Sequence, residues 1–484
     1  MTLLRSMTFV LLLLFAPLVQ AELKVANVFG DHMVLQQEKP IRVWGWADPG
    51  ATVQVDLTDL RDASAYKLKA NSDGEWFVEL PPRKADGRTL QMQVVSGDEK
   101  IDFEDILVGE VWICSGQSNM EWRLTQAANG PREIAAAQHP MIRFFNVPKH
   151  VKQNEPQQDA QEADWMVCSP DTIGGFSAVG YFFGRSLSKE LNVPIGLVGT
   201  NWGGQRIEPF TPPVGFDQVP QLADYVADLK QGKFKGGATQ IYNGMVAGLT
   251  PLSVRGAIWY QGESNANDGL RYEYLKEALV KGWRSVFKNE ELSFYWVQLA
   301  DFGRGHTGQP AGGGWGPVRE GQRRALRVPG TGMAVIIDIG AEKDIHPRNK
   351  QDVGDRLARW ALAKDYGRKI VPSGPLYRSH RREGNKIRIN FDHVGSGLMV
   401  ADKGGVHFLE PVKETPDAEI AEFSVQDKAG KWHWARAMIE GESVVVWSDG
   451  VDEPRNVRFA YDSNPRVNLY NKDGLPASPF TTVD

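Results

Sequence analysis

Between residues 107 and 372, short apolar runs alternate with amphipathic helical patterns, and this alternation constrains the fold more than any other feature of the chain. Over 270–287, for example, apolar side chains recur every three or four residues and line one face of a helix. Strands that alternate with helices predict an α/β domain with a mostly parallel, doubly wound sheet and helices on both faces. The runs that we expect to form its strands are 111–113, 195–198, 257–260, 294–297 and 333–339.

The regions on either side of this domain show the two-residue alternation of β-strands. In residues 22–106, alternating segments such as 41–44 and 53–57 are separated by polar turns, which predicts an N-terminal β-sandwich. The alternation returns in residues 373–484 and predicts a C-terminal β domain. We therefore expect a central α/β domain over 107–372 between two β-sandwich-like domains.

The composition is that of a globular protein. Hydrophobic residues make up 42% and charged residues 24% of the 484 positions, which excludes a disordered chain. Lys and Arg (55) nearly balance Asp and Glu (60), and no long run carries a single sign of charge. Because nucleic-acid binding requires a basic patch, no nucleic-acid partner is expected.

The first 21 residues have the parts of a secretory signal. Arg5 precedes an apolar run over 9–15, and Val19 and Ala21 place small residues at positions −3 and −1 of a cut before Glu22. A membrane anchor is the alternative, but the apolar run is shorter than the roughly 20 residues that span a bilayer. We therefore expect cleavage, no membrane span in the mature chain, and a periplasmic or secreted protein.

Polar residues with catalytic chemistry follow the predicted strands. Ser118 lies in a glycine-containing turn after the first run, and Asp344 and His346 follow the last run. Ligands of a doubly wound sheet bind beyond the carboxyl ends of its strands, so we expect these side chains to lie in one cleft. A serine nucleophile needs a histidine base and a carboxylate that orients the imidazole. The three residues therefore predict nucleophilic catalysis.

A second serine competes with the first, because residues 116–119 (GQSN) and 262–265 (GESN) share one pattern. Spacing alone does not choose between Ser118 and Ser264. The sequence contains no G-x-S-x-G, so the nucleophile elbow of the α/β-hydrolases is not predicted.

Acyl transfer also needs hydrogen-bond donors for the oxyanion of its tetrahedral intermediate. Gly203 or Gly204 is a candidate for a backbone N–H donor, since glycine lets the backbone approach a ligand closely. Asn265 or Gln261 is a candidate for a side-chain amide donor. The nine histidines are scattered without the spacing of metal ligands, so we predict no metal and no cofactor.

Three segments carry a family resemblance. Residues 109–122 (GEVWICSGQSNMEW) strongly resemble the signature of the sialate O-acetylesterase family, a branch of the SGNH hydrolases. Residues 259–265 (WYQGESN) and 344–350 (DIHPRNK) are similar to its other blocks, and 242–245 and 468–471 extend the resemblance over nearly the whole mature chain. The resemblance implies a flavodoxin-like catalytic domain flanked by β domains. It also implies a metal-independent serine esterase that removes O-acetyl groups from sugars.

The resemblance also implies roles for single residues. Ser118 resembles the nucleophile of the family, in preference to Ser264, and His346 resembles the base. Gly204 and Asn265 match the positions of oxyanion-hole residues.

The acid of the triad departs from the wider SGNH pattern, which has it three residues before the histidine. This chain has Lys343 at that position, and Asp344 lies two residues before the histidine. Either Asp344 orients His346, or the chain works as a Ser–His dyad helped by a backbone carbonyl.

Substrate contacts are expected around these residues. Arg206 is a candidate partner for a substrate carboxylate such as that of sialic acid, with a structural salt bridge as the alternative. Trp315, in a glycine-rich loop, is a candidate wall for a sugar ring. The other substrate-binding candidates are Gln117, Gln261 and Glu263.

Two other functions stay open at this point. Relatives of the family deacetylate plant hemicelluloses such as xylan or xyloglucan, which would need an open groove in place of a carboxylate clamp. An inactive secreted glycan-binding protein is the alternative from another class. The presence of Ser118, Asp344 and His346 together argues against it.

Overall fold

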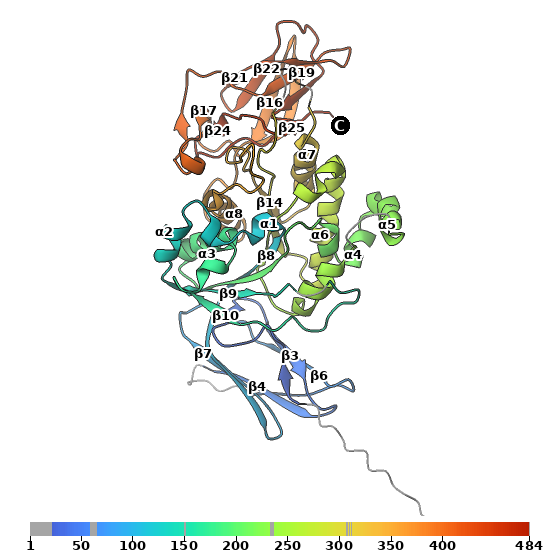
Figure 1. Ribbon diagram of the computed structural model, residues 1–484, viewed down its shortest axis with the longest axis vertical. Helices are drawn as coiled ribbons and strands as arrows, with labels where there is room; N and C mark the ends of the chain where they lie inside the picture. The colour runs from blue at the N-terminus through green and yellow to red at the C-terminus, as the bar shows by residue number, and fades with distance from the viewer. Residues whose placement is uncertain are drawn as a thin grey trace, which may run out of the picture.

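The computed structural model of the protein describes residues 22–58, 65–149, 152–232, 237–305, 308, 310 and 312–483. The expected signal segment, residues 1–21, lies outside the described residues. Within them, a central α/β part lies between two parts rich in β-strands (Figure 1). No helix in these ranges is both long enough and apolar enough to cross a bilayer.

The central sheet is built around the long strand β8 (Glu99–Gly116), whose residues 111–114 are fully buried. β8 pairs in parallel with β11 (Ile195–Asn201) on one side and with β12 (Gly256–Tyr260) on the other. The strand order is β10-β9-β11-β8-β12-β13-β14, and only the edge pair of β10 and β9 is antiparallel. The other strands of this order are β9 (His139–Asn146), β10 (Trp165–Cys168), β13 (Ser293–Val297) and β14 (Thr331–Ala334).

This order confirms the mostly parallel, doubly wound sheet that the sequence predicts. The chain leaves β8 for one side of the sheet and later builds β12 on its other side, so the winding reverses at β8. Ligand sites of such sheets lie at the carboxyl ends of the strands beside this reversal.

Helices cover both faces of the sheet (Figure 1). On one face α3 and α8 pack together, and the ring of Phe183 in α3 contacts Trp112 of β8. On the other face α6 packs with α4 and α7, and Lys276 of α6 contacts the ring of Trp259 in β12. These helices are α3 (Ala178–Leu191), α4 (Pro213–Asp217), α6 (Tyr272–Val286), α7 (Gly316–Arg324) and α8 (Lys350–Lys364); shorter helices are α1 (Ser118–Glu121), α2 (Gly130–Ala135) and α5 (Ala223–Lys230).

The last strand of the central sheet is shorter than the apolar run over 333–339 predicts. β14 ends at Ala334, opposite Val297, the last residue of its neighbour β13. Residues 335–337 are buried but lie beyond the end of that neighbour, so they have no strand to pair with on that side. Hydrophobicity predicted their burial correctly and their conformation wrongly.

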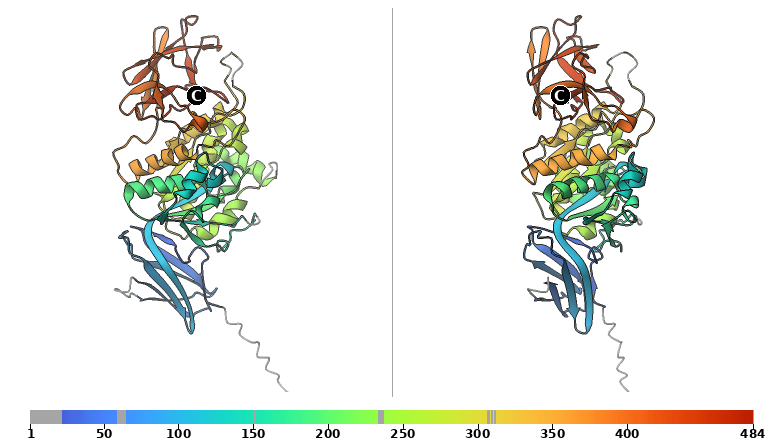
Figure 2. Two further views of the ribbon diagram at one scale, coloured as in Figure 1. Left: turned by 60° about the vertical axis from the view of Figure 1, so that its left-hand side comes forward. Right: turned by 90° about the vertical axis from the view of Figure 1, so that its left-hand side faces the viewer.

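The N-terminal part holds two groups of strands, of which one is continuous with the central sheet through β8. β1 (Lys24–Val25), β3 (Ile41–Trp46) and β6 (Glu75–Leu80) form an antiparallel sheet. β8 begins as the antiparallel partner of β7 and continues without a break into the α/β part (Figure 2). The expected domain boundary at 106/107 therefore falls inside one strand. The remaining strands here are β2 (Val34–Gln36), β4 (Thr52–Thr58), β5 (Ala65–Lys69) and β7 (Leu90–Ser96).

The C-terminal part has antiparallel sheets and its own hydrophobic core, which includes Ile389, Val446 and Phe459. One sheet has the order β15-β16-β22-β21, a second has β20-β19-β23-β25, and a third has β18-β17-β24. Their bounds are β15 (Leu376–Glu383), β16 (Lys386–Asp392), β17 (Leu398–Asp402), β18 (Lys413–Glu414), β19 (Phe423–Gln426), β20 (Trp432–Trp434), β21 (Arg436–Glu440), β22 (Ser443–Trp447), β23 (Asn456–Phe459), β24 (Leu469–Asn471) and β25 (Phe480–Thr481).

Candidate active site

Ser118 stands at the carboxyl end of the central strand. β8 ends at Gly116, and Ser118 is the first residue of the short helix α1. The turn between them requires glycine, because Gly116 has φ of +134° and a Cβ there would lie 2.2 Å from the carbonyl oxygen of Tyr260. The N–H of Gln117 donates to that same carbonyl at 2.9 Å. The serine is thus held at the edge where the winding of the sheet reverses.

His346 meets Ser118 from the loop between β14 and α8. Its Nε2 lies 2.9 Å from the Oγ of Ser118. The ring of Trp122 stacks on the imidazole with the two centroids 4.7 Å apart and the planes 19° apart. Burial lowers the pKa of His346, and the nearby ammonium of Lys350 lowers it further. The imidazole is therefore biased toward the neutral form, which is able to take a proton.

Asp344 holds the histidine mainly through the backbone. Its Oδ1 accepts the N–H of His346 at 3.0 Å, whereas the distance from Oδ1 to Nδ1 of the imidazole is 3.7 Å. The second value is an ion-pair distance, longer than a hydrogen bond. The same carboxylate lies 3.7 Å from the Nε of Arg348. Asp344 thus shapes the loop and places a negative charge beside His346.

The start of α8 fixes the other end of the histidine loop. The Oδ1 of Asn349 caps the helix by accepting the N–H of Asp352 at 3.0 Å. The amide of Asn349 also donates to the carbonyl of Phe408 at 2.8 Å, so the cap is tied to the C-terminal part of the chain.

The glycine turn after β11 lies next to Ser118. A Cβ on Gly203 would be 3.4 Å from the Cβ of Ser118. The N–H of Gly203 is already engaged, because it donates to the Oε2 of Glu121 at 2.7 Å, and Glu121 also pairs with Lys149. Gly204 follows with φ of +70° in open space, and its N–H has no hydrogen-bond acceptor in the described part of the chain. Of the two glycines, Gly204 retains a free N–H donor, and it follows directly on the glycine that lies beside the serine.

The amide of Asn265 points into a buried network. Its Nδ2 donates to both carboxylate oxygens of Glu208 at 3.2 Å and to Asp268 at 3.0 Å. Its Oδ1 accepts the N–H of Ile207 and the side-chain amide of Gln261. Because both amide hydrogens are engaged and the residue is fully buried, the geometry does not support the expected oxyanion role of Asn265.

Gln261 belongs to the same network. Its Nε2 donates to the carbonyl of Gln205 at 3.2 Å, and its Oε1 accepts the hydroxyl of Tyr272 at 2.6 Å. The side chain is fully buried, so it joins the two loops beside the site and has no surface left for a substrate.

Arg206 sits between two buried carboxylates. Its Nη2 lies 2.7 Å from Glu208 and 2.6 Å from Asp268, and it also donates to the hydroxyl of Tyr225. Asp268 also pairs with Arg271 at 3.3 Å, so the two carboxylates are matched by two guanidinium groups. Because Arg206 is bound to both carboxylates, the salt-bridge alternative of the sequence analysis describes Arg206 in this structure.

Gln117 and Glu263 lie directly around the serine. The Oε1 of Gln117 faces the N–H of Ser264 at 3.4 Å. Glu263 accepts a hydrogen bond from the amide of Asn119 at 2.6 Å, and burial raises the pKa of its carboxyl.

The competing serine, Ser264, makes its contacts through its backbone N–H and through its carbonyl, which accepts from Arg206. Since His346 contacts Ser118, the geometry favours Ser118 over the competing serine.

Trp315 lies in a loop that contacts the C-terminal part of the chain. Its ring contacts Phe302 of the central part at 5.1 Å between centroids, and its backbone N–H donates to the Oγ of Ser463 at 3.3 Å. The backbone bond joins this loop to the C-terminal part, and the indole packs within the central part. Its expected role as a sugar wall has no support in these contacts.

Several residues of the site were not singled out in the sequence. Asn119 and Glu121 follow Ser118 closely, and Lys350 closes the segment that contains His346. Their position in the two motif segments was the available signal. Their side-chain partners are set by loops that approach from elsewhere in the chain.

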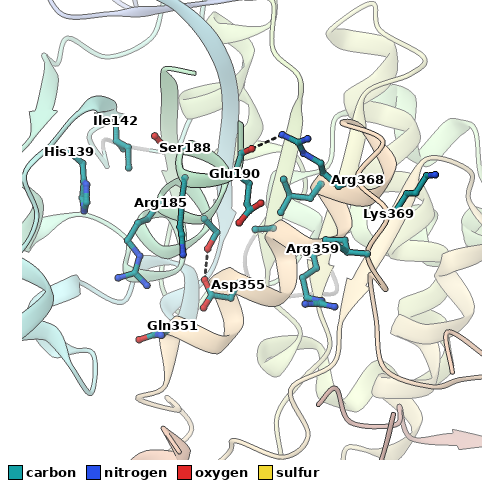
Figure 3. Close-up of a pocket in the computed structure, with 15 residues that line it drawn as sticks. His139, Ile142, Arg185, Ser188, Glu190, Gln351, Asp355, Arg359, Arg368 and Lys369 are labelled. Atoms are coloured by element: carbon teal, nitrogen blue, oxygen red, sulfur yellow. Dashed lines mark hydrogen bonds between the residues drawn. The ribbon is translucent and has the colours of Figure 1, made fainter. Parts of the chain in front are cut away.

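A separate cavity of about 860 Å³ lies between α3 and α8 (Figure 3). Its basic side chains are partly engaged: Arg185 pairs with Glu133, and Arg368 donates to the carbonyl of Glu190. None of the expected site residues lines it. In the described ranges, no group of three or more His, Cys, Asp or Glu residues is arranged to hold a metal ion.

The chain is similar to known carbohydrate esterases. Residues 108–363 match the family described as carbohydrate esterase, sialic acid-specific acetylesterase. A sialate O-acetylesterase of Pongo abelii is 33% identical over 94% of this chain and 92% of its own length. The chain belongs to the sialate O-acetylesterase family. It is therefore a carboxylic ester hydrolase of the carbohydrate esterase type, which confirms the resemblance read from its three segments.

Two further proteins extend the comparison. The human sialate O-acetylesterase is 32% identical over 73% of each chain. The crystal structure of a carbohydrate acetylesterase from Xanthomonas citri is 37% identical, covers 95% of this chain and 99% of its own, and superposes with a TM-score of 0.84. The similarity to this structure covers the β-rich parts as well as the central domain.

Proposed function

We propose that this esterase removes O-acetyl groups from carbohydrates through an acetyl-enzyme formed on Ser118. The observation that carries the proposal is the 2.9 Å contact between the Oγ of Ser118 and the Nε2 of His346. A serine hydroxyl becomes a nucleophile when a neutral imidazole is within hydrogen-bond reach to take its proton.

In the first half-reaction, Nε2 of His346 takes the proton of Ser118 while Oγ bonds to the acetyl carbonyl carbon. The carbonyl oxygen becomes an oxyanion, for which the N–H of Gly204 is the proposed donor. The bond from the carbonyl carbon to the sugar oxygen then breaks, and that oxygen takes the proton from His346. The sugar leaves as an alcohol and the acetyl group stays on Ser118.

In the second half-reaction, water replaces the sugar hydroxyl. His346 takes one proton of the water, whose oxygen bonds to the acetyl carbon. The bond to Oγ breaks, Ser118 recovers its proton from His346, and acetic acid leaves and ionises. Asp344 stabilises the imidazolium in both halves by its charge, and it holds the loop through the N–H of His346.

Acetate release from O-acetylated sugars tests this proposal, with Ser118→Ala as the decisive variant. We expect loss of turnover with an unchanged melting temperature, because the serine hydroxyl contacts only His346 among its described partners. A serine-directed phosphonate should label the wild-type chain and not the variant. Ser264→Ala is the matched control and should keep its activity. Full activity of Ser118→Ala would overturn the mechanism.

The substrate class is a second question, and Arg206 bears on it. The names of the relatives favour O-acetylated sialic acid. The pairing of Arg206 with Glu208 and Asp268 favours an uncharged acetylated polymer such as xylan or xyloglucan, because this guanidinium is already bound to two carboxylates. We carry both as candidates, with the same chemistry at Ser118.

Rates on O-acetylated sialic acid and on acetylated xylan or xyloglucan oligosaccharides separate the two candidates. If Arg206 is structural, Arg206→Met should lower the rates on the charged and the neutral substrate by the same factor. A loss confined to the sialate would assign the arginine to substrate binding.

We also propose that the chain is exported, on the pattern of residues 1–21. Determination of the N-terminal sequence of the protein recovered outside the cytoplasm should give Glu22 as its first residue.

A further inference from the structure

A fully buried lysine lies beneath the proposed catalytic pair. Lys350 is the first residue of α8, and its side chain is 0% exposed. Its Nζ donates to the Oδ1 of Asn119, the residue that follows Ser118. It also lies 5.1 Å from the ring centre of Tyr260 and 5.7 Å from that of Trp122. Burying an ammonium is costly, so a role beyond packing is expected of such a group.

The ammonium of Lys350 determines the orientation of the side-chain amide of Asn119. An ammonium only donates hydrogen bonds, so the amide oxygen of Asn119 must face Lys350 and its NH₂ must face acceptors. The NH₂ donates to Glu263 at 2.6 Å and to the carbonyl of Ile345 at 3.0 Å. Ile345 directly precedes His346, so one amide joins the residue after the nucleophile to the residue before the base.

We infer that Lys350 is a positioning residue of this esterase: through Asn119 it locks the turn that carries Ser118 to the loop that carries His346, and its charge keeps the imidazole unprotonated. This inference rests on the proposed function, because it concerns the same Ser118 and His346. It adds a residue that touches neither the substrate nor the reacting atoms.

The charge part of the inference agrees with the sign of the pKa shifts. Burial lowers the pKa of Lys350 to about 7, while Glu263 and Asp344 oppose that shift. In slightly acidic solution Lys350 is therefore mostly protonated, and its positive charge disfavours imidazolium formation on His346. The other charged groups around the pair are Arg348, Asp344, Glu121 with its partner Lys149, and Glu263.

The test is the pH profile of kcat/KM in Lys350→Met. We expect kcat to fall about 100-fold while KM changes less than about threefold, since a misplaced reacting pair costs about that much. We also expect the acid limb of the profile, where activity falls as His346 becomes protonated, to move to higher pH by about half a unit or more. The reason is that the variant lacks a positive charge near the imidazole. An unchanged acid limb with wild-type kcat would overturn the inference.

Two lysine variants serve as matched controls. Lys343→Met makes the same change on an exposed lysine of the same loop, and its profile should match the wild type. Lys276→Met removes another fully buried lysine, which lies among the rings of Trp259 and Tyr272. It should leave the acid limb in place without lowering the melting temperature, because its Nζ has no hydrogen-bond partner among the described residues. A shift of the acid limb in either control would refute a specific role for Lys350.

A second variant keeps the test decisive if Lys350→Met does not fold. Glu263→Gln retains an oxygen that accepts the amide of Asn119 but removes the negative charge. Without that charge Lys350 loses its proton at lower pH, because Glu263 raises the pKa of Lys350 in the wild type. The acid limb should therefore move to higher pH, in the same direction as in Lys350→Met but less far. Movement to lower pH, or none, would contradict the charge part of the inference.

Asn119→Ala tests the locking part. It should lower kcat without moving the acid limb, and the double variant with Lys350→Met should be no slower than the slower single variant, since both act through one network. Independent, additive losses would refute the lock. Active Ser118→Ala would instead refute the proposed function, so the two failures are distinguishable.

Discussion

The backbone N–H of Gly203 donates to the carboxylate of Glu121 at 2.7 Å. Glu121 ends the helix that begins with Ser118, and Gly203 precedes Gly204, the proposed oxyanion donor. The contact therefore ties the nucleophile turn to the glycine turn. A Cβ on Gly203 would be only 3.0 Å from the same carboxylate, which shows how closely the two turns approach.

Removal of this tie should impair the oxyanion donor. We expect Glu121→Ala to lower kcat by about 10–100-fold, because loss of one well-placed donor costs about that much or more. Glu121→Gln keeps an oxygen for the N–H of Gly203 and should retain most of the activity. Steady-state rates of acetate release check both variants. Equal losses in the two would mean that the negative charge matters and that the tie does not.

The geometry of Asp344 predicts a modest role in chemistry. Because its carboxylate is 3.7 Å from the Nδ1 of His346, Asp344→Asn should lower kcat about tenfold, far less than the roughly 10⁴-fold loss known for a directly bonded triad acid. The amide oxygen of Asn can still accept the N–H of His346, whereas Asp344→Ala removes that bond and should be slower. Single-turnover rates measure both. A 10⁴-fold loss in Asp344→Asn would identify a full triad acid.

The stacking of Trp122 on His346 predicts a change in pH dependence. Burial lowers the pKa of the imidazole, so in the wild type the neutral, active base persists below the ordinary histidine value of about 6.5. Trp122→Ala exposes the ring to water, which favours imidazolium and should move the acid limb of kcat/KM to higher pH. Trp122→Phe keeps an aromatic cover and should move it less. An acid limb unaffected in Trp122→Ala would contradict the burial argument.

The parts of the site that the sequence predicts depend on the strand ends. Ser118 and His346 are 228 positions apart, yet both follow strands of one parallel sheet, and the carboxyl ends of such strands lie at one edge. The strand pattern and the Ser–His chemistry were therefore sufficient to expect a cleft with both residues. The stacking of Trp122 on His346 could not be predicted in this way, because hydrophobic periodicity does not show which rings come into contact.

The sequence could not settle the roles of Asn265 and Arg206, because it does not show which of the polar residues near them each side chain contacts. Asp268 is three residues after Asn265, and Glu208 is two after Arg206, but only the packing of the two loops makes these four side chains one network. An Asn or Gln whose side-chain amide is free to bind a substrate cannot be distinguished by sequence from one whose amide is already hydrogen-bonded within the protein. Trp315 likewise depended on the C-terminal part, whose Ser463 lies 148 positions away.

The turn that presents Ser118 should be intolerant of any side chain. Gly116 combines φ of +134° with only 2.2 Å between a built Cβ and the carbonyl oxygen of Tyr260, so Gly116→Ala strains the backbone and pushes β8 from β12. We expect a loss of about 3 kcal/mol or more in the free energy of unfolding. Gly30→Ala is the matched control, since nothing lies within 4 Å of its built Cβ and its φ is not positive. Urea unfolding of both variants gives the difference. Equal stability would mean that the turn can relax, and the rate of Gly116→Ala would then report how far Ser118 moves from His346.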